Sequence, residues 1–185
     1  MKNYIIGIGG TGAKCLEHLL HCCSAGLGPE NLWAGMVDQD EANGNVSKTK
    51  ILLNKYTNLR NNLRNESKHD LAKKSNLFKT HITSNADAVW LPMKEANPTL
   101  EDLIKYNLLK PEVKGLMDCL YDPEELKLNL SEGFRARPNI GAAAILSTTA
   151  NEDDIFWSQI YKAIDAARGG EEVRVFIISS IFGGT

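Results

Sequence analysis

A glycine-rich turn between an apolar run and a helical pattern constrains this chain more than any other feature of its sequence. Residues 4–8 form an apolar run typical of a short buried strand, and residues 7–12 fit the pattern Gly-x-Gly-x-x-Gly. A helix is predicted over about 11–25. Glycines let a backbone approach a phosphate closely, and a helix N-terminus offers N–H groups with a partial positive charge. The alternative is a tight turn that binds nothing. We expect phosphate contacts from Gly9, Gly10, Thr11 and Gly12.

Two further apolar runs predict the fold class. Residues 32–37 predict a second strand, and a strand–helix–strand unit built from continuous apolar runs is typical of a parallel sheet covered on both faces. Residues 173–180 predict a strong final strand. We expect an α/β fold, a Rossmann-like three-layer parallel sheet with helices on both faces, in a single domain over residues 1–185.

The middle of the chain is more polar than its ends. Residues 41–85 are rich in Asn, Lys, Arg and Ser, and the segments 61–65 and 68–74 within them predict exposed helix and loop. Residues 99–130 look helical, with breaks at Pro111 and Pro123 and a good helix start at Asp122. We therefore expect a polar helical insertion around 41–130.

Two more helices are predicted before the final strand. Asn139 is expected to cap a helix that runs to residue 149. A second helix is expected over about 153–168, with the glycines at 169 and 170 ending it. The final strand then leads into Gly-Gly-Thr, and a core strand seldom closes a domain in this way. We expect the fold to continue beyond this sequence.

Charge and hydropathy exclude some classes of partner. The formal net charge is −2, so no overall field attracts nucleic acid or an anionic membrane. The basic stretch at 68–74 lacks interleaved aromatic residues and is interpreted as a solvated face. No apolar run is long enough for a membrane span, and no signal peptide is recognised. We expect a cytoplasmic protein with neither nucleic-acid nor membrane partners.

Three of the four cysteines lie in the first predicted helix, beside two histidines. Zinc binding is one interpretation, but the spacing matches none of the common Cys-x-x-Cys pairs. Cys15, Leu19 and Cys22 repeat at i, i+4 and i+7, which favours a buried helix face instead. No metal-binding cluster is expected here.

Two carboxylates follow the second predicted strand, at Asp38 and Asp40. Dinucleotide-binding folds hold a ribose hydroxyl with an acid at this strand end. Carboxylates spaced i, i+2 could instead serve Mg²⁺ through water. The third possibility is that one of them only caps the following segment.

Two later loops carry further candidate ligand-binding residues. The loop before the helix at 139 has two arginines, which could clamp phosphates or remain solvated. A glycine-rich loop at the carboxyl end of the last strand could cradle a phosphate. The candidates in these two loops are Arg135, Arg137, Pro138, Asn139, Gly183, Gly184 and Thr185.

Taken in order, these segments resemble the nucleotide-binding half of the tubulin/FtsZ superfamily. Residues 7–12 resemble the family's first phosphate loop, and residues 38–40 lie where the family has an acidic loop. Residues 133–141 resemble the loop that faces the γ-phosphate, and residues 173–185 resemble the strand that leads into the Gly-Gly-Thr-Gly signature. The likeness is greatest to large bacterial tubulin-like proteins. Arg135, Arg137 and Phe182 depart from it, since FtsZ has glycine or small residues there.

The resemblance implies binding of GTP or GDP, with Mg²⁺ as a further candidate ligand, and self-association into filaments or oligomers. In that family, hydrolysis also needs an acidic loop that the next subunit delivers from a later domain. Because no such region occurs in these 185 residues, we expect a binder with negligible turnover, and no catalytic residue is assigned.

Three other readings stay open. An NAD-dependent oxidoreductase would fit the acid at Asp38, but no Tyr-x-x-x-Lys set is found. A ThiF-like ATP-binding adenylating enzyme begins with a similar glycine loop, but its downstream arginine-and-lysine pattern is not evident. A non-catalytic assembly module that has lost its ligand would use Arg135, Arg137 and Phe182 to fill the pocket.

Overall fold

The sheet is parallel and is built around the first strand. In the computed structural model, which describes residues 1–40, 44–65, 75–84, 88–94, 98–148 and 153–183, β1 (Lys2–Ile8) pairs with β2 (Asn31–Val37) on one side. The last strand, β5 (Val173–Ile178), pairs with β1 on the other side. These pairings confirm the prediction that the three apolar runs form strands of one parallel sheet.

Two very short strands complete the sheet beside β2. β3 (His81–Ile82) pairs with the start of β2 and β4 (Val89–Trp90) with its end, both in parallel. The strand order is therefore β3-β2-β1-β5, with β4 also on β2. Neither short strand was predicted, because two residues cannot display a periodicity.

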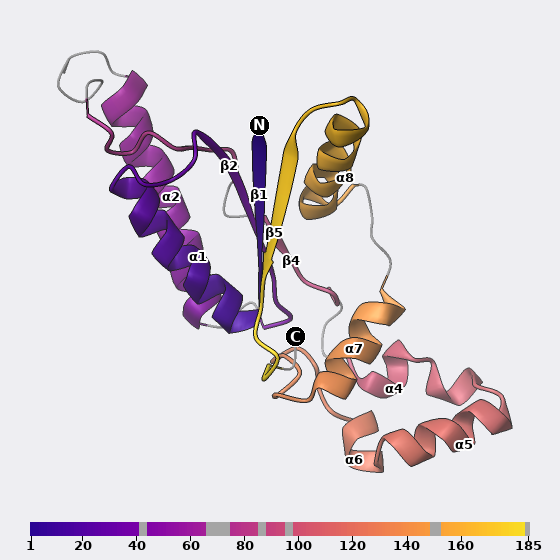
Figure 1. Cartoon of the computed structure of the whole chain (residues 1–185). Helices are drawn as coiled ribbons and strands as arrows, with labels where there is room; N and C mark the ends of the chain where they lie inside the picture. The colour runs from indigo at the N-terminus through magenta and orange to yellow at the C-terminus, as the bar shows by residue number, and fades with distance from the viewer. Residues whose placement is uncertain (41–43, 66–74, 85–87, 95–97, 149–152, 184–185) are drawn as a thin grey trace.

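Helices cover both faces of the sheet, which confirms the α/β, Rossmann-like class (Figure 1). α1 (Gly9–Ser24) and α2 (Gly44–Asn65) lie on one face, and α8 (Ile155–Arg168) lies on the other. Alternate strand residues point to opposite faces. Leu32, Ala34 and Met36 pack towards α1 and α2, whereas Tyr4, Ile6, Trp33 and Val37 pack with Phe156 of α8.

Residues 61–64 at the end of α2 are largely exposed, as predicted, whereas the predicted segment at 68–74 lies outside the described residues. The first part of α2 is more buried than its polar composition suggested. It buries four side chains, Val46, Thr49, Leu53 and Tyr56, along one stripe. The Thr49 hydroxyl donates to the carbonyl oxygen of Ala13 at 2.9 Å. The Tyr56 hydroxyl donates to the carbonyl oxygen of Thr80, also at 2.9 Å. The stripe escaped the sequence interpretation because two of its four members are polar and its neighbours are mostly Asn, Lys and Arg.

The prediction of a cysteine face on α1 was wrong. Cys15 and Cys22 are exposed, whereas Cys23 is fully buried. The buried apolar side chains of α1 are those of Ala13, Leu16, Leu20 and Cys23. These side chains have the same helical spacing as the predicted stripe but are rotated by one residue, because the strand contacts made by Leu16 and Leu20 set the orientation of the helix.

A small helical layer lies beyond the carboxyl ends of the strands (Figure 1). It comprises α4 (Leu100–Leu103), the 3-10 turn η1 (Tyr106–Leu108), α5 (Pro111–Leu120), α6 (Pro123–Leu126) and α7 (Pro138–Ser147). Its own core includes Leu100, Leu130, Phe134 and Ile140. Because this layer lies at the strand ends, the loop before α7 also lies there.

Prolines and caps set most of the helix boundaries in this layer. Pro111 and Pro123 each begin a helix, and Asp122 caps α6 with a complete capping box, as expected. The expectation that Asn139 caps α7 was wrong. Arg137 occupies the cap position without a side-chain hydrogen bond, because Pro138 takes the first helical position.

Within the described part of the chain, no helix combines the length and the apolar character that a membrane span would require.

Candidate functional site

The N-terminus of α1 lies directly at the carboxyl end of β1. Gly9, the first helical residue, has a φ of 67°, a left-handed value that favours glycine. The preceding residue, Ile8, has no polar side chain to cap the helix, and the first turn holds no acidic residue. Among the described residues no side chain caps this end of the helix, where the first-turn N–H groups and the positive end of the helix dipole lie.

The glycines at positions 7 and 12 hold this turn against the sheet. A Cβ added to Gly12 would lie 2.5 Å from the carbonyl carbon of Gly7 and 2.7 Å from the carbonyl oxygen of Ile178. A Cβ on Gly7 would in turn lie 2.8 Å from the backbone of Gly12. Close packing of α1 on β1 and β5 thus requires both glycines, which is the packing role of the last glycine in this type of turn.

A buried carboxylate lies at the carboxyl end of β2. Asp38 is 3% exposed, and its Oδ1 accepts a hydrogen bond from the backbone N–H of Asp40 at 3.2 Å. The backbone N–H of Asp38 donates to the carbonyl oxygen of Trp90 at 3.3 Å. Asp40 itself is half-buried. These bonds fix the carboxylate of Asp38 and the backbone of Asp40 on the turn that follows the strand.

The loop before α7 approaches the same place from the helical layer. Phe134 is buried in that layer, and Gly133 has a φ of 84°. A Cβ on Gly133 would lie 3.2 Å from the Cβ of Asp40. Arg135 and Ala136 also have left-handed φ values, 46° and 57°. Non-glycine residues in this region carry strain that the surrounding structure must hold.

The chain returns to this point after β5. The backbone N–H of Phe182 donates to the hydroxyl of Ser180 at 3.1 Å, which turns the chain so that Ser180 and Gly183 face the other segments. Phe182 itself is exposed. The predicted contacts at Gly184 and Thr185 lie outside the described residues.

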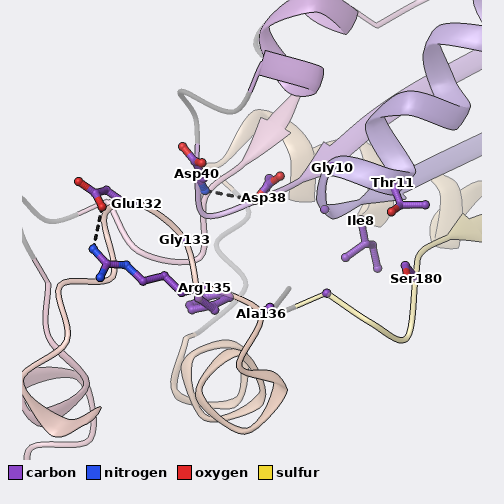
Figure 2. Close-up of a pocket in the computed structure, with 13 residues that line it drawn as sticks. Ile8, Gly10, Thr11, Asp38, Asp40, Glu132, Gly133, Arg135, Ala136 and Ser180 are labelled. Atoms are coloured by element: carbon purple, nitrogen blue, oxygen red, sulfur yellow. Dashed lines mark hydrogen bonds and ion pairs between the residues drawn. The ribbon is translucent and has the colours of Figure 1, made fainter. Parts of the chain in front are cut away.

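These stretches of chain enclose one cavity of about 210 Å³ (Figure 2). Seven of the residues predicted from the sequence line it: Gly9, Gly10, Thr11, Asp38, Asp40, Arg135 and Gly183. Six further residues line it without having been predicted: Ile8, Glu132, Gly133, Phe134, Ala136 and Ser180. An acid three residues before Arg135 was the one sequence signal that could have indicated Glu132.

Four predicted residues lie outside the lining. Gly12 packs behind the turn. Arg137 points away, with its Nε 3.8 Å from a carboxylate oxygen of Glu125. Pro138 and Asn139 begin α7, where the carbonyl oxygen of Asn139 accepts a hydrogen bond from Tyr121 at 3.4 Å.

The charges around the cavity are mixed. Three carboxylates, those of Asp38, Asp40 and Glu132, share the lining with one guanidinium. That guanidinium, of Arg135, pairs with Glu132 at 2.7 Å. In the described part of the chain, no group of three or more His, Cys, Asp or Glu side chains could hold a metal ion. Two aspartates could still supply part of a Mg²⁺ shell, because this ion commonly keeps several waters and takes phosphate oxygens as ligands.

The volume of the cavity limits its occupant. Sites for whole small molecules usually measure about 300–1,000 Å³. At about 210 Å³, this cavity lies below that range, so it has room for a small polar group.

Comparisons with family models, curated proteins and solved structures gave no match to this chain.

Proposed function

We propose that this cavity binds the phosphates of a nucleotide, with GTP or GDP as the ligand and Mg²⁺ as its counter-ion. One observation carries the proposal. Segments far apart in the sequence converge on one cavity at the carboxyl ends of β1, β2 and β5. The chain passes from β1 to β2 on one side and places β5 on the other. Such a switch point is where open α/β sheets bind their ligands.

We propose guanine as the base because of the order in which the lining segments follow one another along the chain. The glycine turn, the acidic turn, the loop before α7 and the loop after β5 follow one another as in the tubulin/FtsZ superfamily, which they resemble. By the same resemblance we propose assembly through self-association, and binding without appreciable turnover by these 185 residues alone.

A dinucleotide or ATP site is the second candidate. The observation that favours it is the buried carboxylate of Asp38 at the end of β2, where dinucleotide folds hold a ribose hydroxyl. The hydrogen bond that Asp40 donates to Oδ1 of Asp38 would then fix the acid for this contact.

The test is a thermal-shift series with GTP, GDP, ATP and NAD, each with and without Mg²⁺. A ligand that binds only the folded state raises its stability. At 100 times the dissociation constant this gives about 2.7 kcal/mol, or about 5–10 °C for a chain of this size. A Mg²⁺-enhanced shift with GTP and GDP supports the proposal. A shift with only ATP or NAD favours the second candidate, and no shift with any of the four would contradict both.

A further inference from the structure

The exposed face of α1 carries two cysteines and two histidines, Cys15, His18, His21 and Cys22. The helix packs on the strands and beside α2 with its other faces (Figure 1). Cysteine is among the residue types most often found buried, so two exposed cysteines on one helix are unusual. Their expected burial was an argument against metal binding at this helix, and the structure removes that argument.

His18 and Cys22 lie one helical turn apart. Positions i and i+4 are separated by about 40° around an α-helix, whereas i and i+3 are separated by about 60°. The side chain at i+4 also leans back towards the turn that contains i. The two zinc-binding histidines of the His-Glu-x-x-His motif have the same spacing. His18 and Cys22 are therefore the two ligands on this face that are best spaced to share one ion.

The imidazole of His18 is in the form that binds a metal ion. Its Nδ1 lies 2.7 Å from the carbonyl oxygen of Lys14. Because a carbonyl oxygen only accepts, Nδ1 of the neutral ring carries the proton and donates it, and Nε2 keeps its lone pair. Histidines that bind metals almost always donate their second ring N–H to such a partner, which fixes the tautomer and the orientation of the ring. His18 is exposed, so its ring is open to an ion from solvent.

We propose that His18 and Cys22 form half of a zinc site, and that a second copy of the chain completes it. Structural zinc takes four ligands in a tetrahedron, and two cysteines with two histidines are a common set. One chain offers fewer, since no group of three His, Cys, Asp or Glu side chains in the described residues could hold an ion. Two copies related by a two-fold axis, with α1 facing α1, supply Nε2 of His18 and Sγ of Cys22 twice. Each cysteine binds as the thiolate and releases its proton to water.

The charges on this face allow two copies to meet. Lys14 is exposed there, whereas Glu17 is buried and pairs with Lys48 at 2.7 Å. When two copies of α1 cross near residues 18–22, Lys14 of each copy lies away from the crossing point. Like charges are therefore not forced together, and the neutral ligands at the centre add no repulsion before zinc binds.

The test titrates Zn²⁺ and Co²⁺ into the chain, which a phosphine keeps reduced. Calorimetry measures the stoichiometry, and sedimentation compares the mass with that of the same protein in a chelator. We expect one ion per two chains, a doubling of mass that the chelator reverses, and the visible absorption of tetrahedral Co²⁺ bound by thiolates.

Substitutions on α1 identify the ligands. His18→Ala and Cys22→Ala should each weaken zinc binding about 100-fold or more, since even the outer partners of metal ligands are worth about 10–100-fold. His21→Ala and Cys15→Ala are matched controls on the same face and should leave binding nearly unchanged. All four side chains are exposed, so the metal-free variants should melt with the wild type. Where an alanine variant does not fold, His18→Gln or Cys22→Ser takes its place.

Three outcomes would overturn the proposal. The first is the absence of zinc binding by the wild type. The second is binding of one ion per chain without a change in mass, which would exclude the shared site. The third is a loss of binding in the controls equal to that in His18→Ala and Cys22→Ala. These measurements use no nucleotide, so their outcome is independent of the proposed function.

Discussion

Two glycines of the first turn have different tasks, although they stand two residues apart. Gly10 lines the cavity, whereas Gly12 is buried against Gly7 and Ile178. The motif alone assigns both to phosphate binding. The difference between the two roles depends on how closely α1 approaches the sheet. That distance is known only from the folded structure.

Substitution of these glycines should therefore affect different properties. Gly10→Val places a branched side chain on the cavity wall, and we expect loss of nucleotide binding with a melting temperature close to that of the wild type, because valine suits a helix better than glycine. Gly12→Ala forces a Cβ to within 2.5 Å of backbone, and we expect a loss of about 1–3 kcal/mol in the free energy of unfolding. Denaturant melts and nucleotide titrations of both variants check this. Retained binding by Gly10→Val would remove the first turn from the site.

The carboxylate of Asp38 should matter mainly through Mg²⁺. Asp38→Asn keeps the shape of the side chain and an oxygen for the N–H of Asp40 but removes the negative charge. We expect GTP affinity to fall by about tenfold or more with Mg²⁺ present, and by less without it. Titrations under the two conditions measure the difference. Equal losses would assign Asp38 to the ribose or to the turn itself.

At the scale of elements, local sequence patterns predicted the main strands and the helix starts of the helical layer. They did not predict the contacts that some helices and loops make in the folded chain. Continuous apolar runs identified β1, β2 and β5, and Pro111, Pro123 and Asp122 marked helix starts. The buried stripe of α2 was hidden because it uses Thr49 and Tyr56, whose hydroxyls find backbone partners only in the folded chain. In the same way, Glu132 enters the cavity by tertiary placement, and its position three residues before Arg135 was the one local sign of it.

The contact between α1 and α2 should give stability a pH dependence. Lys48 of α2 lies 2.7 Å from the carboxylate of Glu17 in α1, and this hydrogen-bonded ion pair lowers the pKa of Glu17. A lowered pKa stabilises the fold above the pKa of the unfolded chain, about 4.3, and the gain is lost as the pH falls through the lower folded value.

Glu17→Gln should consequently have a lower melting temperature than the wild type at pH 7, and the difference should shrink as the pH falls below about 4. Glu30→Gln, at an exposed position before β2, controls for the loss of one negative charge. Thermal melts over a pH series provide the measurement. A difference that is independent of pH would show that Glu17 acts by packing alone.

At the scale of the whole molecule, β5 forms an edge of the described sheet. Within the described residues β5 pairs only with β1, and its side chains Val175, Phe176 and Ile177 are 51%, 51% and 65% exposed. An apolar cavity of about 530 Å³ continues from this strand to α8, lined by residues such as Ile160, Val175 and Ile177. Open apolar edges of this kind favour strand-to-strand association.

Self-association of these 185 residues should therefore depend on β5. Ile177→Lys places a charge on the exposed edge, and we expect it to reduce concentration-dependent association markedly without lowering the melting temperature, since little burial is lost. Light scattering over a range of protein concentrations measures this. Undiminished association would place the contact on another surface.

The central claim is that the cavity at the strand ends is the site of the nucleotide phosphates. The most direct measurement is an amide NMR titration of the chain with GTP and Mg²⁺. The account predicts that the largest shift changes occur at residues 9–11, 38–40 and 132–136, together with Ser180 and Gly183. Changes concentrated instead at α8 and β5, or no changes at a saturating concentration, would contradict it.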